Sequence, residues 1–529
     1  MKIEEVIEDM SLKQKVGQLF QVGFSGTEIT SEIEELIKED YIGGIIYFSR
    51  NIENPVQLAE LSNKLQRIAM ESDLGIPLIL SADQEGGIVT RLQGGTHFPG
   101  NMTIGASRLP EMARKAGKAT ARELKAAGIT MNLAPVLDVN NNPDNPVIGV
   151  RSFGEDPELV ADMGSAYVKG LQKEGVMACG KHFPGHGDTA VDSHLDLPVI
   201  DHSQDRLNRV ELFPFKKAIS EKIDSIMTAH IYFPTIEPRK GVPATLSRAV
   251  LKDLLREELG FEGMIITDCM EMEAITSTTG TVEGAIKTLE AGSDTVLISH
   301  SYPKQKKAIK AVIKAVKGGR LKKKRINNSV KRILGLKKKY ISLNKKPEIN
   351  NSQFDKKYSL KVAKEISRRG VTLVKDEKKY IPLKNSENIS VKVIDFNMGR
   401  ISPVEQDKKG ENRLVYFLRD KGIQVKHITL NKGDKLPDFK EKSLEKSFTI
   451  ICTYDAVKNK YQREVVNKLS KDQLIVIALR NPYDYELFDD ISTFITTYDH
   501  SPTNLQIAAE ILVGELEPAG SLPVTLEDH

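Results

Sequence analysis

The sequence of 529 residues has little of what marks a membrane-spanning, disulfide-bonded or nucleic-acid-binding protein. Its only cysteines, Cys179, Cys269 and Cys452, lie in apolar runs without metal-binding spacing, so we expect buried free thiols. No segment approaches the ~20 uninterrupted apolar residues of a transmembrane helix. Lys and Arg total 76 against 72 Asp and Glu, and this small excess does not suggest a nucleic-acid partner.

A recognisable leader is also missing. The first residues, MKIEEVIEDMSLKQKVGQLF, carry acidic side chains where a signal peptide has a basic and then an apolar segment. We therefore expect a cytoplasmic protein, unless a leader has been removed. Apolar residues make up 40% of the chain and charged residues 28%, as in a soluble globular protein, and the length predicts two or three domains.

Residues 1–340 alternate short apolar strands with longer helical patterns. Continuous apolar strands that alternate with helices are typical of a parallel sheet covered by helices. Eight such units over about 300 residues predict a (β/α)8 TIM-type barrel, with a doubly wound open sheet as the alternative. The predicted strands are LFQVGF, IGGIIYF, PLILSAD, MNLAPVLDV, VMACGKHF, SIMTAHIYF, GMIITDC and DTVLIS.

Polar side chains stand where several of these strands end. In a TIM barrel the C-terminal ends of the strands form the active-site face. A polar group at the end of an apolar strand otherwise needs a buried partner of its own, so convergence on one pocket explains the pattern. The residues concerned are Asp83, Asp138, Lys181, His182, His230 and Asp268.

The remaining third of the chain predicts a linker and a second domain. The basic region 318–346 carries an apolar stripe at helical spacing, so we interpret it as the last barrel helix with a solvated face rather than as a polyanion site. Residues 341–356 are polar, lack periodicity and predict a linker. Residues 357–529 predict an αβα three-layer sandwich with the strands GVTLVKD, ISVKVIDF, QVKHITL, FTIICTY, LIVIALRN and FITTY.

The stretch KHFPGHGDT from Lys181, followed by Asp192-Ser193-His194, concentrates titratable groups in a Pro- and Gly-punctuated loop. One interpretation is metal ligation, but the Pro and Gly residues remove the helix that would place His182 and His186 on one face. A second is that histidines satisfy backbone groups of a long loop, which suits His186. A third is acid–base catalysis, because an Asp-x-His pair supplies an imidazole oriented by a carboxylate. For metal ligation the candidates are His182, His186 and His194 with Asp188 or Asp192.

Six ordered motifs carry a resemblance to a known family. They are DQEGG, FPGNMTIGA, NPVIGVRSFGEDP, KHFPGHGDT with its downstream Asp-Ser-His, MTAHI and GMIITDCMEM. Together they resemble glycoside hydrolase family 3, and most closely its β-N-acetylglucosaminidase branch. LRNPYD and GSLPVT resemble the αβα domain of two-domain members more weakly.

The resemblance implies a retaining mechanism with a covalent glycosyl intermediate. Asp268 matches the family's nucleophile, although it could instead cap the following helix. In most glycosidases a second carboxylate is the acid–base group, whereas this branch uses a histidine paired with an aspartate, which maps onto His194 and Asp192. An imidazole with a pKa near ~6.5 gives and takes protons near neutral pH.

The resemblance also implies which residues hold the sugar and what is not needed. Arg91 and Arg151 could alternatively brace loops through ion pairs, and Asp138, His230 and Asp188 are either ligand contacts or supports for other side chains. No metal or organic cofactor is required. The implied substrate-binding residues are Asp83, Arg91, Arg151, Lys181 and His182.

We expect an exo-acting enzyme that releases terminal non-reducing N-acetylglucosamine (GlcNAc) from small carbohydrates such as peptidoglycan-derived GlcNAc–MurNAc fragments. Phosphorolysis is the alternative within the family, because a histidine brings no negative charge to repel phosphate. A β-glucosidase or xylosidase would leave the Asp192-Ser193-His194 motif unexplained. A metal-dependent hydrolase and a non-catalytic sugar-binding protein are alternatives from other classes. We also expect the loop that carries His194 to move between the two catalytic steps.

Overall fold

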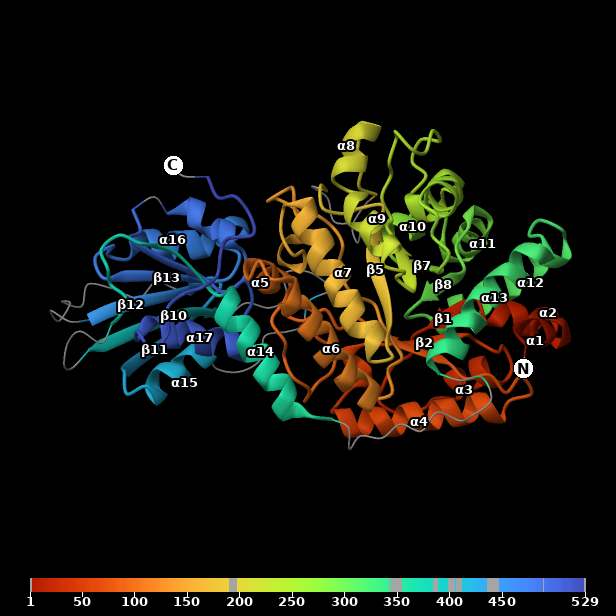
Figure 1. Ribbon diagram of the computed structural model, residues 1–529, viewed down its shortest axis with the longest axis horizontal. Helices are drawn as coiled ribbons and strands as arrows, with labels where there is room; N and C mark the ends of the chain where they lie inside the picture. The colour runs from red at the N-terminus through yellow and green to blue at the C-terminus, as the bar shows by residue number, and fades with distance from the viewer. Residues whose placement is uncertain are drawn as a thin grey trace.

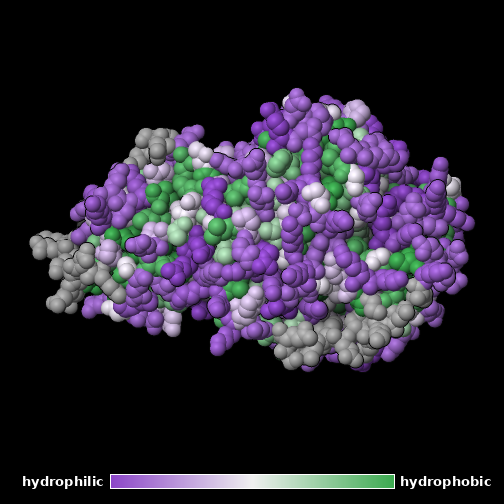
Figure 2. All heavy atoms as spheres, in the orientation of Figure 1, coloured by the Kyte–Doolittle hydropathy of each residue, from purple (hydrophilic) through white to green (hydrophobic). Residues whose placement is uncertain are grey.

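The computed structural model contains two globular parts that lie side by side, a larger one from the first two thirds of the chain and a smaller one from the last third (Figure 1). Most of the face seen in Figure 2 is hydrophilic, with smaller hydrophobic areas on both parts. No helix in the described part of the chain has the length and apolarity needed to span a membrane. The described residues are 2–189, 197–341, 343, 354–383, 389–397, 405, 412–434, 447–488 and 490–527.

The larger part is a closed barrel of eight parallel strands in the order β1 to β8, as predicted. Its strands are buried on both faces because side chains fill the barrel and helices cover it outside. All eight predicted strands are confirmed. Their bounds are β1 Phe20–Val22, β2 Gly44–Tyr47, β3 Ile79–Ala82, β4 Met131–Asn132, β5 Met177–Phe183, β6 Ser225–Thr228, β7 Met264–Cys269 and β8 Thr295–Ile298.

The barrel helices begin where the sequence supplies capping residues. Asn54 accepts hydrogen bonds from the amides of Val56 and Gln57 at the start of α4, and Asp156 does the same for α7. The helices are α1 Ile3–Asp9, α2 Leu12–Gly17, α3 Ser31–Lys38, α4 Pro55–Glu71, α5 Asn101–Ala106, α6 Pro110–Ala126, α7 Pro157–Lys173, α8 Gln204–Arg209, α9 Phe213–Ser220, the π-helix η4 Ala249–Glu258, α10 Glu273–Thr276, α11 Thr281–Ala291, α12 Tyr302–Lys317 and α13 Lys323–Tyr340.

Within the basic region 318–346, residues Lys323–Tyr340 form helix α13, in agreement with the predicted helix. In α13, Ile326, Val330 and Ile333 are buried against the barrel, whereas Lys323 and Lys324 are exposed. Lys323 and Lys324 thus lie on the solvated face of an amphipathic helix, whereas Lys337 of the same helix is buried.

The smaller part is a six-stranded sheet in the order β11-β10-β12-β13-β14-β9, in which only β9 is antiparallel to its neighbour. Separate hydrophobic clusters pack on the two faces of the sheet, so the predicted αβα architecture is confirmed. The elements are α14 Lys356–Gly370, β9 Thr372–Asp376, β10 Ser390–Asn397, α15 Arg413–Asp420, β11 Gln424–Asn431, β12 Ser447–Thr453, α16 Lys460–Lys468, β13 Leu474–Ala478, β14 Thr493–Thr496 and α17 Pro502–Leu512.

The two parts meet through apolar and polar contacts. Helix α14 packs against α5 and α6 of the barrel as well as against α17, and it begins one residue before the predicted domain start at 357. Met102 and Val150 of the barrel share a hydrophobic cluster with Tyr483 and Tyr498 of the second domain. These contacts fix loops of the second domain beside the barrel. The divisions at 340 and 357 stay a prediction.

One polar residue ties the second domain to the barrel directly. Asp499 Oδ2 accepts hydrogen bonds from the amide of Gly100, at 2.7 Å, and from Thr103 Oγ1, at 3.1 Å. All three residues are buried, so the carboxylate satisfies donors that water does not reach.

All three cysteines are free. Cys179 and Cys452 are buried, as predicted, whereas Cys269 is half-buried because it lines the pocket described below.

Candidate active site

A pocket of about 1370 Å³ is lined by the residues at the C-terminal ends of the barrel strands. Asp83, Arg91, Arg151, Lys181, His182 and Asp268 all line it, which brings together every described residue of the predicted site. Asp192 and His194, the predicted acid–base pair, lie in the segment 190–196, outside the described residues. Side chains of the second domain, including Asn412, Arg413, Tyr416 and His500, complete the wall.

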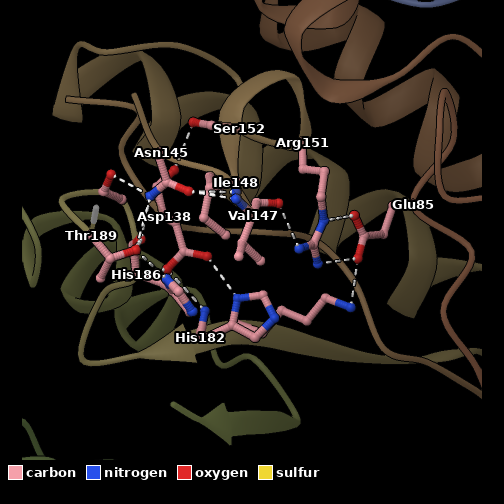
Figure 3. A network of polar contacts seen from close by, with 12 residues as sticks. Glu85, Asp138, Asn145, Val147, Ile148, Arg151, Ser152, His182, His186 and Thr189 are labelled. Atoms are coloured by element: carbon pink, nitrogen blue, oxygen red, sulfur yellow. Dashed lines mark hydrogen bonds and ion pairs between the residues drawn. The ribbon is translucent and has the colours of Figure 1, made fainter. Parts of the chain in front are cut away.

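Glu85 connects the cations of the site (Figure 3). Its carboxylate accepts two hydrogen bonds from Arg151, from Nη2 at 2.8 Å and from Nε at 2.9 Å. Lys181 Nζ lies 2.7 Å from Glu85 Oε1 and 2.6 Å from Asp83 Oδ1. Lys181 therefore sits between two carboxylates, and Asp83 is held in place through Lys181.

The charges in this network stabilise one another. Burial alone would raise the pKa of Glu85, but the adjacent Arg151 and Lys181 outweigh it and hold that pKa well below its usual range. Burial opposes the charge of Arg151 and Lys181 as well, and the neighbouring carboxylates outweigh it and raise both pKa values. All three groups thus stay ionised around neutral pH, and the pocket carries a fixed array of charges.

Asp138 supports His182 from behind the pocket. Its side chain is fully buried, and Oδ2 lies 2.7 Å from Nδ1 of His182. Oδ1 accepts hydrogen bonds from the amides of His182, at 3.1 Å, and His186, at 2.7 Å. The contact of Nδ1 with a carboxylate assigns Nδ1 as the donor and fixes the ring, as in buried Asp–His pairs elsewhere. Asp138 is therefore a positioning residue for His182.

The loop after β5 is fastened to the loop that carries Arg151. Asn145 Nδ2 donates to the carbonyls of His186, at 2.8 Å, and Gly187, at 2.7 Å. Its Oδ1 accepts from the amides of Val147 and Ile148, both at 2.8 Å. Asn145 thus uses both ends of its amide to hold two loops together.

His186 lines the pocket, and its ring contacts a side chain of its own loop. Its Nδ1 lies 3.0 Å from Thr189 Oγ1, and burial lowers its pKa to about 4, with the neighbouring His182 as the next cause. The ring is therefore neutral at physiological pH. Asp188 lies 2.7 Å from Nε2 of His202 and does not line the pocket, so it supports the loop.

Asp268 stands near the end of β7 and lines the pocket. Its Oδ1 accepts a hydrogen bond from the amide of Cys269 at 2.7 Å, which orients the carboxylate. Helix α10 starts only at Glu273 with Met272 as its N-cap, so the alternative role of Asp268 as a helix cap is wrong.

His230 braces the same strand end from behind. Its Nε2 lies 3.0 Å from the carbonyl oxygen of Cys269 and its Nδ1 lies 2.8 Å from Thr245 Oγ1. His230 is buried and does not line the pocket, so it supports the backbone that follows Asp268.

One group of possible metal ligands lies in the described part of the pocket. The ligand atoms of Cys269, Glu271 and His300 are all within 4.8 Å of one another. However, both carboxylate oxygens of Glu271 accept backbone amides, from His300 at 2.6 Å and from Ser301 at 3.1 Å. Burial also raises the pKa of the Cys269 thiol to about 11. This group therefore fits a loop anchor better than a metal centre.

Sequence reasoning missed the roles of Glu85 and Asn145. Both lie inside motifs that had been singled out, DQEGG and NPVIGVR. The signal for Glu85 was its own charge, because it is a carboxylate two residues after Asp83 in a site predicted to hold the cations Arg151 and Lys181. Asn145 gave no such signal, because its partners are backbone groups.

Comparison with known proteins agrees with this arrangement. Residues 11–336 match the glycosyl hydrolase family 3 N-terminal domain. A protein named beta-hexosaminidase A from Pseudoalteromonas piscicida is 31% identical, over 94% of this chain and 92% of its own length. A beta-hexosaminidase of Neisseria meningitidis serogroup C is 37% identical over 53% of this chain and 77% of its own length.

A solved structure extends the match to the second domain. A glycoside hydrolase family 3 beta-N-acetylglucosaminidase from Paenibacillus sp. str. FPU-7 superposes with a TM-score of 0.90 at 40% identity, covering 98% of this chain and 100% of that one. The barrel with its charged pocket is thus the catalytic domain of a glycoside hydrolase. The chain belongs to glycosyl hydrolase family 3.

Proposed function

We propose that this glycoside hydrolase is an exo-acting, retaining β-N-acetylglucosaminidase. The observation that carries the proposal is the convergence of Asp268 with Asp83, Lys181 and His182 in one pocket. The hexosaminidase names of its relatives support GlcNAc as the sugar released. Asp83 and Lys181 would bind hydroxyl groups of the terminal sugar, and Arg91 and His182 would flank it.

In the first step, Asp268 attacks the anomeric carbon of GlcNAc while the bond to the leaving-group oxygen breaks. His194 donates a proton to that oxygen, so the leaving group departs as a neutral alcohol. Asp192 orients the imidazole and stabilises its protonated form before transfer. The products are a covalent glycosyl–Asp268 ester and a neutral His194.

In the second step, His194 takes a proton from a water molecule as that water attacks the anomeric carbon. The ester bond to Asp268 breaks and the carboxylate leaves, which regenerates the enzyme. Two inversions give GlcNAc with retained β configuration. The fixed charges around Glu85 do not exchange protons in this scheme, because their pKa values lie far from neutrality.

Peptidoglycan fragments in the cytoplasm are the proposed substrates. The pocket, at about 1370 Å³, exceeds the ~300–1,000 Å³ typical of small-molecule sites. A pocket of this volume can hold the terminal GlcNAc together with a leaving group larger than one sugar. The cytoplasmic location rests on the N-terminal sequence and stays a prediction.

Rates on matched 4-nitrophenyl β-glycosides of GlcNAc and glucose, measured with and without phosphate, test the proposal. We expect kcat/KM on the GlcNAc glycoside to exceed that on the glucoside by at least about 100-fold, because a site built to hydrogen-bond a substrate group rejects analogues that lack it. Free GlcNAc should be the product even in phosphate buffer.

Three outcomes would contradict this assignment. Predominant formation of GlcNAc-1-phosphate would make the enzyme a phosphorylase, and a preference for the glucoside would make it a glucosidase. Loss of activity on exhaustive chelation, restored by added metal, would favour a metal-dependent mechanism.

A further inference from the structure

The start of α15, in the second domain, contributes a group of side chains to the wall of the catalytic pocket. Asn412, Arg413 and Tyr416 all line the pocket together with residues of the barrel. Arg413 and Tyr416 are three apart in the helix, so their side chains lie on one face. We call Asn412, Arg413 and Tyr416 the α15 face.

Arg413 differs from Arg50, Arg151 and Lys181, which also line the pocket. Arg50 donates to the carbonyls of Phe24 and Ser299, and Arg151 and Lys181 are paired with Glu85. The guanidinium of Arg413 is exposed and makes no hydrogen bond or ion pair with any described residue. A guanidinium presents a planar fork of donors that matches a carboxylate.

Asn412 adds a donor that lacks an acceptor. The residue is only 2% exposed, and its Oδ1 accepts the amide of Leu414 at 3.0 Å, which caps α15. Its Nδ2 is buried and has no hydrogen-bond partner among the described residues. A buried amide donor without a partner costs about 1–3 kcal/mol, so an acceptor supplied by a ligand would remove a real penalty.

Tyr416 gives this wall an apolar surface. Among the large hydrophobic side chains that are exposed in the described part of the chain, only Tyr416 is aromatic. Its surface is 59% accessible. Pro502 and Leu505 at the start of α17 line the same pocket, and α17 packs against α15. The ring of Tyr416 offers a flat apolar face on which the C–H face of a sugar ring can pack.

Glu405, an acidic residue of the second domain that lines this pocket, already has partners for its negative charge. Glu405 is buried, and its Oε1 lies 2.6 Å from Nη2 of Arg480 while Oε2 accepts from the hydroxyl of Tyr454. Arg480 also lies 3.0 Å from Asp455 Oδ2. The negative charge of Glu405 is therefore already compensated by Arg480, whereas Arg413 has no ion-pair partner among the residues that the structure describes.

We propose that the α15 face is a subsite for the leaving group, and that it selects a sugar carrying a carboxylate. Arg413 pairs with the carboxylate, the Nδ2 of Asn412 donates to it or to a neighbouring oxygen, and Tyr416 packs against the ring. This inference rests on the proposed function, because it places a leaving group beside the GlcNAc that Asp268 binds. It assigns the second domain a direct part in substrate selection.

Three GlcNAc glycosides test the subsite: GlcNAc-β-1,4-N-acetylmuramic acid, the same disaccharide with its lactyl carboxylate converted to an amide, and 4-nitrophenyl GlcNAc. Arg413→Ala removes the charged contact of the subsite. It should lower kcat/KM on the acid disaccharide by about 10–100-fold, as expected for the loss of a charge-assisted pair. The change on the aryl glycoside should stay within twofold. Wild-type enzyme should prefer the acid over the amide, and Arg413→Ala should abolish that preference.

Matched variants separate binding from folding. Tyr416→Ala should weaken both disaccharides equally, by several-fold, while Tyr416→Phe retains wild-type rates because the ring is kept. Arg419→Ala removes an exposed arginine from the same helix that does not line the pocket, and it should change none of the three rates.

The outcomes distinguish this inference from the proposed function. If Arg413→Ala matches wild type on the acid disaccharide, or loses activity equally on all three substrates, the subsite is refuted while β-N-acetylglucosaminidase activity stands. If wild-type enzyme cleaves none of the three, the proposed function is itself refuted and the subsite falls with it.

Discussion

At the scale of single residues, Glu85 is the group on which the charges of the pocket depend. It is the shared partner of Arg151 and Lys181, and all three side chains are at most 3% exposed. Glu85→Gln keeps the shape of the side chain but removes the negative charge that lies between the buried cations Arg151 and Lys181. Breaking a buried ion pair from one side typically costs about 3–5 kcal/mol, so we expect a loss of about 3 kcal/mol in the free energy of unfolding.

Chemical denaturation of the wild-type protein and of Glu85→Gln between pH 3 and pH 8 measures this loss of stability. The folded pKa of Glu85 lies below its unfolded value, so its stabilisation is present above about pH 4.3 and is lost as the pH falls toward the folded pKa. The difference between wild type and variant should be constant from pH 6 to pH 8 and shrink below about pH 4. Glu111→Gln, which breaks the exposed pair with Arg114, should cost less than about 1 kcal/mol. Equal losses for the two variants would contradict the role of Glu85.

At the scale of elements, α13 carries an unusual feature on its buried face. Lys337 is fully buried, its Nζ donates to Gln18 Oε1 at 2.7 Å, and burial lowers its pKa to about 7. In the unfolded chain a lysine has its ordinary pKa of about 10.4, so the unfolded state binds more protons between these two values. This lysine therefore destabilises the fold fully below about pH 7, and the penalty fades as the pH rises toward 10.4.

Lys337→Met should accordingly stabilise the barrel. We expect a gain of about 2 kcal/mol at pH 7, since relief of the buried charge outweighs the lost hydrogen bond to Gln18. The gain over wild type should become smaller at pH 10. Unfolding free energies of the two proteins at both pH values measure it, with the exposed Lys338→Met as control. A variant that is less stable than wild type at pH 7 would overturn this account of Lys337.

The elements also show how far sequence reasoning reaches. All fourteen predicted strands exist, and most of them are continuous apolar runs that local chemistry defines as buried strands. Strand β11 is mostly exposed. Asp83, Lys181 and Asp268 could be placed in one pocket because the strands of a barrel end at one face. The support given by Asn145 could not be predicted, because its partners are backbone groups of a loop distant in sequence. The same holds for Arg413, whose place in the pocket depends on how the two domains pack.

At the scale of the whole molecule, one pocket draws on both domains. The buried carboxylate of Asp499 and the cluster around Met102 and Tyr483 hold the second domain against the barrel. This packing brings Arg413 and Tyr416 into the lining of the pocket that Asp268 also lines. The barrel thus supplies the groups proposed to act on GlcNAc, while the second domain shapes the room for what is attached to it.

The covalent intermediate is the central claim of this account, and mass spectrometry of the trapped enzyme tests it most directly. His194→Ala slows the water attack, while 4-nitrophenyl GlcNAc still reacts because its leaving group needs no proton. Rapid acid quench should give protein heavier by one GlcNAc residue, with the added mass on the peptide containing Asp268, and His194→Ala/Asp268→Asn should give none. Absence of the adduct from His194→Ala, or its location on another residue, would contradict a retaining mechanism with Asp268 as the nucleophile.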